Sequence, residues 1–304
     1  MIEIIIVDDC STENYSEVYN DFLNLNLTIL KPEKNAGPGV CRHMGVDKAV
    51  GKYITFIDSD DKYIDSTALQ RLYSEALANP NADMICGQTV EELEDGTTYI
   101  HERSFIWCFA KLYKTEFLRK NNINFNDTRA NEDNSFCTLC SLCTDNVTWL
   151  LQPVYFWRFQ PSSITRENNH EYKYKGFKSY VENMIWVYDQ CVLRGIEHKD
   201  KCAYHCIAVW IRIYFHFLDV FQNKGEAKAI EILKLARWFY EAAYSRIDDK
   251  TIKKKFAEVY QNMVTTSLAH FLTVVTNVSM PEYTYRVKNE DYSEFNENYE
   301  YYLK

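Results

Sequence analysis

The chain has 304 residues, enough for one large domain or two modest ones. Apolar residues make up 46% and charged residues 25% of the sequence, so a sizeable core can form. The net charge of −9 disfavours nonspecific nucleic-acid binding, which needs a basic footprint. Ten cysteines in so long a chain do not make the disulfide pattern of a small secreted scaffold, and we expect most to be reduced and buried.

The first residues carry no sign of a secretory signal, because IEIIIV follows Met1 without a basic stretch or a cleavage site. No run approaches the ~20 apolar residues that span a bilayer. We therefore expect a cytoplasmic location, either free or peripheral to the inner face of the membrane.

The chain opens with an apolar, β-branched run, Ile2–Val7, which ends in Asp8 and Asp9. This pattern predicts a buried strand with carboxylates at its carboxyl end. A helix is expected over residues 15–25, and a second short strand over residues 27–30.

A glycine-rich loop precedes the next expected helix, residues 40–49. Asn35 and Gly37 lie in the loop, and Arg42 lies in the first helical turn. Free N–H groups and the helix dipole at such a terminus attract anions, and an arginine there can reach a phosphate. Taken alone, an ordinary loop explains the glycines equally well.

The stretch KYITFIDSDD, residues 52–61, is a β-rich run that stops in Asp58, Asp60 and Asp61. It predicts a strand buried on both faces of a parallel sheet, at whose carboxyl edge ligands collect. Carboxylates at i and i+2 leave a strand on the same side, so Asp58 and Asp60 can converge on a divalent cation that also binds substrate phosphates. The alternative is an acidic turn that caps the following helix.

Strands and helices continue to alternate after this stretch, which predicts a doubly wound α/β layout. The expected elements are a helix over 66–78, a strand over 82–87, a hairpin over 89–101, a strand or helix start and then a helix over 107–119, and strands over 147–151 and 153–165. Lys111 and Lys114 face the site or water, and water is the better expectation for lysine.

Glu132 and Asp133 open a helix that carries Cys137, Cys140 and Cys143. The dipole favours acidic residues at a helix N-terminus, and beside a sugar–phosphate site one of them could act as a general base. The C-x-x-C-x-x-C spacing puts the three thiols on one broad helix face. Without a fourth ligand nearby, a core helix is favoured over a metal cluster.

Arg158, Ser162 and Ser163 lie in an aromatic strand and turn, and all three are phosphate-capable donors. Beyond His170 the pattern becomes helical, with helices expected over 172–193, 201–222, 226–245 and 251–275. The second of these is apolar nearly all round and should be central. We predict three regions: 1–169, 170–280 and an acidic, tyrosine-rich tail over 281–304 that is poorly packed or partner-bound.

Five motifs in order, IIIVDDCST, NAGPGVCRHMG, YITFIDSDD, NEDNSF and YFWRFQPSSIT, resemble the family 2 inverting glycosyltransferases of the GT-A fold, the capsule and cell-wall type. The resemblance covers residues 2 to about 166. It implies a GT-A domain with a mostly parallel sheet flanked by helices. The helical region that follows would then be an acceptor site or an oligomer interface.

The resemblance also implies roles for the residues of the nucleotide site. Asp8 or Asp9 would touch the base, while Asn35, Gly37 and Arg42 would line the nucleoside and diphosphate.

Around the reacting centre, the resemblance implies that Asp58 and Asp60 hold Mn²⁺ or Mg²⁺ on the donor diphosphate. Asp133 would be the general base, with Glu132 beside it. Arg158, together with one of the two serines named above, would approach the leaving diphosphate.

The implied function is metal-dependent, inverting transfer of a sugar from a nucleotide-sugar, with a UDP-sugar expected, to a hydroxyl acceptor such as a carbohydrate. Two other interpretations stay open. One is an inactive glycosyltransferase-like binding or assembly subunit. The other is a transferase acting on modified DNA bases, against which the acidic composition weighs.

Members of the family normally begin with a further strand and a Pro-Tyr/Phe-Asn loop upstream of IEIIIVDD. Three explanations compete: a truncated start, a strand from another chain, or a strand from residues 271–281, which also continue a helical stripe. A sheet without an inner strand exposes apolar edges, so we expect compensation such as oligomerisation through the helical region.

Overall fold

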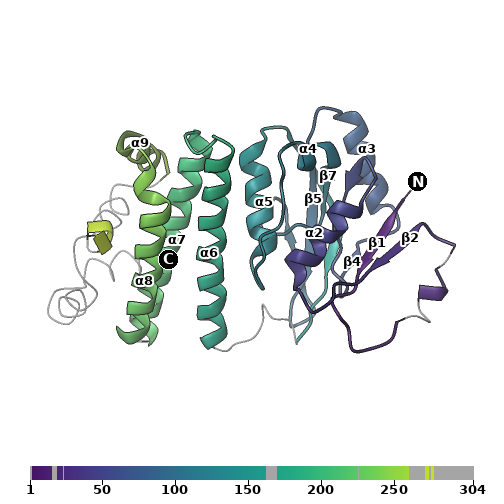
Figure 1. Ribbon diagram of the computed structural model, residues 1–304, viewed down its shortest axis with the longest axis horizontal. Coiled ribbons are helices and arrows are strands. Elements are labelled where there is room, and N and C mark those ends of the chain that lie inside the picture. The colour runs from purple at the N-terminus through teal and green to yellow at the C-terminus, as the bar shows by residue number, and fades with distance from the viewer. Residues whose placement is uncertain are drawn as a thin grey trace. The chain divides into compact units, whose positions relative to one another are not determined.

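The computed structural model describes residues 2–15, 19–22, 24–161, 170–224, 226–259, 271–273 and 275–276. The chain divides into two compact units, Met1–Asn183 and Met184–Lys304 (Figure 1). The division falls inside helix α6 (His170–Leu193). The three regions predicted from the sequence stay a prediction, and the tail over 281–304 lies outside the described residues.

The first unit is an α/β domain with two sheets. A two-stranded parallel sheet pairs β1 (Ile4–Val7) with β2 (Leu27–Leu30). A six-stranded sheet has the order β3-β7-β5-β8-β4, with β6 paired to β5. Its strands are β3 (Tyr53–Ile54), β4 (Lys62–Tyr63), β5 (Met84–Glu92), β6 (Thr98–His101), β7 (Lys111–Lys114) and β8 (Val147–Trp157).

In the described part of this unit four helices precede α6. They are α2 (Pro38–Lys48), α3 (Ala68–Ala78), α4 (Thr115–Lys120) and α5 (Glu132–Cys143). Two of them, α2 and α5, carry candidate site residues. Helix α2 begins two residues earlier than predicted because Pro38 suits a first helical turn, where no N–H is needed. Of the predicted helix over 15–25, Tyr19 and Asn20 are helical, and part of that range lies outside the described residues.

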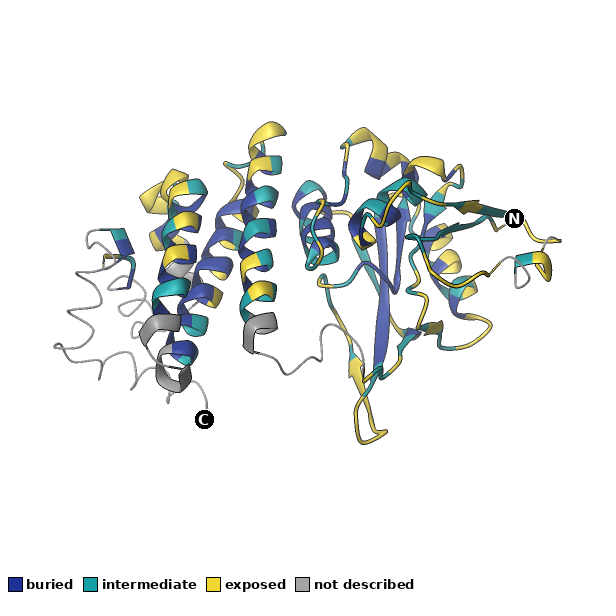
Figure 2. Cartoon of the chain, turned by 60° about the horizontal axis from the view of Figure 1, so that its bottom comes forward, coloured by how far each residue is buried: buried dark blue, intermediate teal, exposed yellow. Residues whose placement is uncertain are grey.

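Strands β5 and β8 form the centre of the larger sheet; β5 is buried over Met84–Val90 and appears dark blue in Figure 2, whereas β8 is only partly buried. They run parallel from the Met84–Val147 pair onward, with a register shift around Gly87. A Cβ at Gly87 would lie 2.4 Å from Cγ2 of Val154, so only glycine permits this close approach. The two strands predicted over 147–151 and 153–165 are the single strand β8.

The sheet is mixed where the sequence predicted mostly parallel pairing. Among the described strands of the larger sheet, one pair is parallel and four are antiparallel. One antiparallel pair is the predicted hairpin β5–β6, whose turn uses Gly96 at a φ of +79°. The α/β class with a helical C-terminal region is confirmed.

The predicted strand over 52–61 is much shorter than expected. Only Tyr53 and Ile54 pair, and they pair antiparallel to β7. Phe56 is held by aromatic packing instead, with ring centroids 5.4 Å from Phe125 and 5.8 Å from Phe136. Side-chain packing thus fixes the segment that leads to Asp58, although this segment forms no strand-pairing hydrogen bonds beyond Ile54.

Helix α5 confirms the expected core helix. Cys137 and Cys140 are fully buried, and the Tyr113 hydroxyl lies 3.4 Å from the Cys137 sulfur. All ten cysteines are free thiols, eight of them buried. Burial raises the pKa of the Cys137 thiol to about 12, so it has little thiolate character.

The second unit is helical in its described part. It contains the end of α6, then α7 (Asp200–Lys224), α8 (Glu226–Ala242), the short 3-10 helix η2 (Tyr244–Arg246) and α9 (Asp249–Val259). Helix α7 packs against both α8 and α9, as expected of a central helix. Among the described helices, none is long and apolar enough to cross a membrane.

Residues 271–273 and 275–276 belong to the stretch that was a candidate for the absent first strand. They are helical in the structure. Phe271 is fully buried, with its ring centroid 5.6 Å from Trp210 and 5.1 Å from Phe217. The described part of this stretch therefore belongs to the helical core.

Candidate functional site

Asp9 fixes the glycine-rich loop that precedes α2. One carboxylate oxygen accepts a hydrogen bond from the Ala36 amide at 2.6 Å, and the other accepts one from the Gly37 amide at 2.8 Å. The Asn35 side-chain amide donates to the Asp9 carbonyl at 2.9 Å. Burial works against the charge of Asp9, but the two amides outweigh it and lower the pKa. Asp9, Asn35 and Gly37 are thus brought together.

Asp8 has different partners. Its carboxylate accepts a hydrogen bond from the Ser11 amide at 2.8 Å and pairs with the Lys31 ammonium at 3.1 Å. Hydrogen bonds from Ser11, helped by Lys31, lower the pKa of Asp8 to about 2. Asp8 is therefore ionised at neutral pH, and its carboxylate is not tied to the glycine loop.

Arg129 contacts the same loop from the segment before α5 and was missed by sequence reasoning. Its guanidinium donates to the Asn35 side-chain oxygen and, at 3.3 Å, to the Asn35 carbonyl. Its side chain also covers Gly37. The two segments lie 94 residues apart, so no local pattern announces the contact.

Arg42 joins the two acidic motifs. Its Nη2 lies 2.8 Å from Oδ1 of Asp58, and its Nη1 lies 2.5 Å from Oε1 of Glu132. The Glu132 side chain is only 7% exposed, so this ion pair neutralises a buried carboxylate. The end of the KYITFID run and the start of α5 therefore meet at one guanidinium.

Helices α2 and α5 approach each other closely because position 39 is glycine. A Cβ there would lie 2.6 Å from the Asn126 carbonyl oxygen and 3.2 Å from Cβ of Glu132. Real Cβ atoms do not come within 2.6 Å of a backbone oxygen, so any side chain would push α2 away. Gly39 thus allows the contact between Arg42 and Glu132.

Asp133 lies in the first turn of α5 and is half-buried. Its Oδ1 accepts the Asn134 amide at 2.7 Å, and it makes no ion pair with any described residue. Burial, followed by the neighbouring Glu132 charge, raises its pKa, and Arg42 opposes this only in part. Of the two acidic residues, Asp133 is the one left to accept a proton.

A turn from Asp58 to Asp61 follows the run of residues 53–57. The Asp61 amide donates to the Asp58 carbonyl at 3.1 Å. The Tyr155 hydroxyl accepts from the Asp58 amide at 3.0 Å and donates to the Asp61 carboxylate at 2.9 Å. Burial raises the pKa of Asp61 to about 6, although hydrogen bonds from Arg158 and Tyr155 oppose the shift. Tyr155 was not predicted as a site residue.

Arg158 reaches the same turn, and its predicted approach to a leaving diphosphate stays a prediction. Its amide donates to the Asp61 carboxylate at 2.9 Å, and its Nε donates to the Asp60 carbonyl at 2.7 Å. Asp60 is exposed. Ser162 and Ser163 lie outside the described residues.

Asp58 and Asp60 are the candidate metal ligands. Within the described residues, no group of three or more His, Cys, Asp or Glu side chains is arranged to hold a metal ion. Two carboxylates nevertheless suit Mg²⁺ or Mn²⁺, since such ions usually take their remaining ligands from water and substrate phosphates. Asp60 is exposed, and Asp58 is partly occupied by Arg42.

Lys111 lies outside this group, and the expectation that it faces water is wrong. It is 2% exposed, and its ammonium donates to the Trp107 carbonyl at 2.6 Å. Buried backbone carbonyls hold its charge, which is a structural role.

Comparison with known proteins relates the first part of the chain to one protein family. Residues 1–139 match the family profile described as "Glycosyl transferase family 2". The chain therefore contains a glycosyltransferase family 2 domain over residues 1–139. It is a glycosyltransferase of the GT-A fold, as the order of its motifs predicted.

Characterised and uncharacterised members of the family resemble the chain at modest identity. The "Uncharacterized glycosyltransferase EpsJ" of Bacillus subtilis is 27% identical over 67% of this chain and 66% of its own length. "Glycosyltransferase GlyG" of Streptococcus pneumoniae is 26% identical over 64% of this chain and 73% of its own. "Poly(ribitol-phosphate) beta-N-acetylglucosaminyltransferase TarS" of Staphylococcus aureus is 24% identical over 83% of this chain but only 46% of its own.

Among solved structures, S. aureus TarS 1-349 in complex with UDP-GlcNAc superposes with a TM-score of 0.69 at 16% identity. The match covers 95% of this chain and 83% of that one. The likeness shows that the two share a fold. The chain spans less than half of full-length TarS and about two thirds of EpsJ.

Proposed function

We propose that this glycosyltransferase moves a sugar from a UDP-sugar to a hydroxyl group of a carbohydrate-type acceptor, with inversion at the anomeric carbon. One observation carries the proposal. Arg42 pairs with both Asp58 and Glu132, so the candidate metal-binding turn and the candidate base lie at the same place. Direct displacement requires that the diphosphate of the donor and the attacking hydroxyl of the acceptor lie close together, so the residues that bind each of them must also be close.

Asp133 is the proposed general base. An acceptor hydroxyl has a pKa far above 7, so a carboxylate must take its proton as it attacks. The raised pKa of Asp133 makes it a stronger base than an ordinary aspartate. Glu132 is a poorer candidate, because Arg42 occupies its carboxylate.

The leaving nucleoside diphosphate gains negative charge as its bond to the sugar breaks. Mn²⁺ or Mg²⁺ on Asp58 and Asp60 would offset that charge when bound. Arg158 lies next to the same turn through its bond to the Asp60 carbonyl, so its guanidinium can approach a diphosphate there. Tyr155 and Asp61 hold the turn in shape.

The nucleotide end of the donor would lie at the loop that Asp9 fixes. Asn35 and Gly37 belong to this loop, and Asp8 precedes Asp9 in the chain, with its carboxylate held by Ser11 and Lys31. UDP-GlcNAc is the first donor to test, because TarS, to which the chain is similar over 83% of its length, is named as an N-acetylglucosaminyltransferase. The acceptor proposed is a hydroxyl-bearing polymer or glycan.

The test is a calorimetric titration of UDP into the metal-free protein and then into the protein with Mn²⁺. We expect binding that Mn²⁺ strengthens and that Asp60→Ala abolishes. The matched control is Asp47→Ala, which removes an exposed carboxylate from α2 without touching the site. Release of UDP from UDP-GlcNAc and other UDP-sugars then identifies the donor.

Failure of UDP to bind under either condition would contradict the proposal and favour a binding or assembly subunit. Equal UDP binding by Asp60→Ala and the unaltered protein would remove the proposed metal site. A DNA retardation assay across salt concentrations separates the third interpretation, since binding to DNA weakens steeply with salt.

A further inference from the structure

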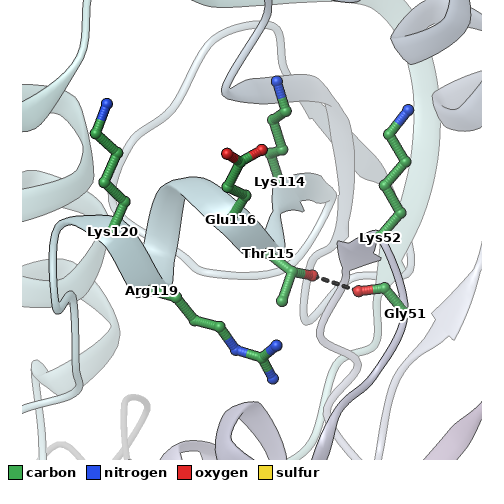
Figure 3. Close-up of a pocket in the computed structure, with 7 residues that line it drawn as sticks. All are labelled: Gly51, Lys52, Lys114, Thr115, Glu116, Arg119 and Lys120. Atoms are coloured by element: carbon green, nitrogen blue, oxygen red, sulfur yellow. Dashed lines mark hydrogen bonds between the residues drawn. The ribbon is translucent and has the colours of Figure 1, made fainter.

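A hollow lies at the amino end of β3, whereas the Asp58–Asp61 turn follows its carboxyl end. It has a volume of about 350 Å³, toward the small end of the range of small-molecule sites. None of the residues that line it belongs to the proposed donor site. They are Gly51, Lys52, Lys114, Thr115, Glu116, Arg119 and Lys120 (Figure 3).

The lining of this hollow is strongly cationic. It carries three lysines and one arginine against the single carboxylate of Glu116, in a chain whose net charge is −9. None of the four cations forms an ion pair with a carboxylate in the described part of the chain. Such unbalanced positive charge in a concave site attracts an anion.

Backbone contacts hold the floor of the hollow in place. The Thr115 hydroxyl donates to the Gly51 carbonyl at 2.6 Å, and the Thr115 amide donates to the Lys52 carbonyl at 3.0 Å. The Arg119 guanidinium donates to the Ala49 carbonyl at 2.6 Å. A ligand would therefore meet a preformed floor, which lowers the ordering cost of binding.

The lysines are arranged differently from Arg119. In Figure 3 the side chains of Lys52, Lys114 and Lys120 extend to the same side of α4, while Arg119 turns the other way. Arg119 is thus occupied with the floor. Of the three lysines, Lys114 lies 3.5 Å from the Pro80 carbonyl, and the Lys52 ammonium lies 5.3 Å from the centroid of the Tyr53 ring, so both are held by weak contacts that leave their charge uncompensated. The ammonium group of a lysine is a compact charge at the end of a flexible side chain. It can therefore adjust its position to bind a phosphate that enters from solvent.

We propose that this hollow binds a phosphate group of an anionic ligand, at a site separate from the donor nucleotide. A phosphate suits a hollow lined by three lysines better than a single carboxylate would, because it offers more oxygens and more charge. The phosphate could belong to a lipid headgroup or to a soluble compound. Val50, next to the hollow, is 80% exposed, which makes a lipid source worth a separate arm of the test.

The first arm titrates inorganic phosphate into metal-free, isotope-labelled protein at constant ionic strength, and follows the amide signals of Gly51 and Glu116. We expect saturable shifts that become at least about tenfold weaker in affinity when Lys52, Lys114 and Lys120 are all changed to glutamine. Chloride at the same ionic strength should give no saturation.

A matched triple variant controls for the loss of three charges. Lys199→Gln, Lys250→Gln and Lys253→Gln change three exposed lysines of the helical unit, and should leave the phosphate affinity unchanged. Shifts that never saturate, or that weaken equally in both triple variants, would overturn the proposal. UDP binding with Mn²⁺ should persist in both, so the result is independent of the donor site.

The second arm identifies the source of the phosphate. Co-sedimentation compares vesicles of phosphatidylglycerol with vesicles of phosphatidylcholine. Retention on the first only, lost in the hollow variant and kept in the control, assigns the site to a lipid headgroup. Saturation by phosphate without retention on either vesicle assigns it to a soluble phosphate compound.

Discussion

Nη2 of Arg42 lies 2.8 Å from Oδ1 of Asp58, while the other guanidinium nitrogen holds Glu132. The two carboxylates come from segments 74 residues apart in the sequence, and this one side chain compensates both. Because Glu132 is buried, the pair is a structural requirement of the site before any substrate is bound.

Replacing Arg42 with glutamine leaves the buried Glu132 carboxylate without its cation. We expect the free energy of unfolding to fall by about 3 kcal/mol, measured by urea denaturation, because an uncompensated charge is then buried. Adding Glu132→Gln to Arg42→Gln should recover on the order of 1 kcal/mol or more. A double variant no more stable than Arg42→Gln would show that the two side chains are not coupled.

Asp133→Asn removes the proposed base but keeps the shape of the side chain. We expect the rate of sugar transfer to fall by roughly 10²–10⁴-fold, while the affinity for UDP with Mn²⁺ stays within about twofold of the original. Steady-state kinetics and calorimetry measure the two quantities. A loss of UDP affinity without a loss of turnover would place Asp133 in donor binding instead.

The pH dependence of transfer should report the raised pKa of Asp133. The base works only when ionised, so kcat/KM should rise with pH through a pKa above the ordinary aspartate value of about 4 and then level off. Burial and Glu132 raise that pKa, so Glu132→Gln should move the rise to lower pH. A rise centred near 4, or one that Glu132→Gln leaves in place, would contradict this assignment.

Much of this site was predictable from the sequence. Strand ends followed by aspartates, and a glycine-rich loop leading into a helix, are local signals; the structure brings Asp9 and Gly37 together and pairs Arg42 with Asp58. These signals located Asp58 because the apolar run stops there, even though only two residues of that run pair in the sheet. The motif order supplied the family, which the domain comparison confirmed.

The partners of these residues were not predictable. Arg129 reaches Asn35 across 94 residues, and Tyr155 reaches Asp58 across 97, so neither contact leaves a local pattern. The strand pairing could not be predicted either. Short edge strands such as β3 and β4 form because of the strands they pair with, and their own sequence does not determine that pairing. The sequence around Lys111 is that of a surface lysine. Its burial is evident only from the structure, where its ammonium donates to the Trp107 carbonyl.

Gly39→Ala tests the close approach of α2 to α5. The added Cβ would lie 2.6 Å from the Asn126 carbonyl oxygen, so α2 must shift, at an expected cost of about 1–3 kcal/mol in unfolding free energy. The shift should also weaken UDP binding, since Arg42 lies one turn further along the helix. Denaturation and calorimetry measure these effects.

Gly176→Ala is the matched control, because it lies in α6 with no atom within 4 Å of the added Cβ. It should stabilise the protein by up to about 1 kcal/mol through helix propensity. Equal effects of the two substitutions would show that Gly39 is not a packing requirement.

Asp8 and Asp9 are adjacent, but the structure gives them different tasks, and amide substitutions should separate them. The Asp9 carboxylate accepts hydrogen bonds from the backbone amides of Ala36 and Gly37. In Asp9→Asn, the NH₂ group of the new side chain would face one of these two amides and could not accept its hydrogen bond. We expect a loss of about 1–3 kcal/mol in unfolding free energy and weaker UDP binding, because the loop before α2 is no longer fixed.

Asp8→Asn loses its pairing with Lys31, an ion pair with a half-exposed ammonium, so its stability should change by less than about 1 kcal/mol. If Asp8 touches the nucleotide base, Asp8→Asn should still weaken UDP binding. Calorimetry would then show a lower affinity for UDP, while denaturation would show an unchanged free energy of unfolding. The same stability loss in both variants would mean that the loop does not depend on Asp9 in particular.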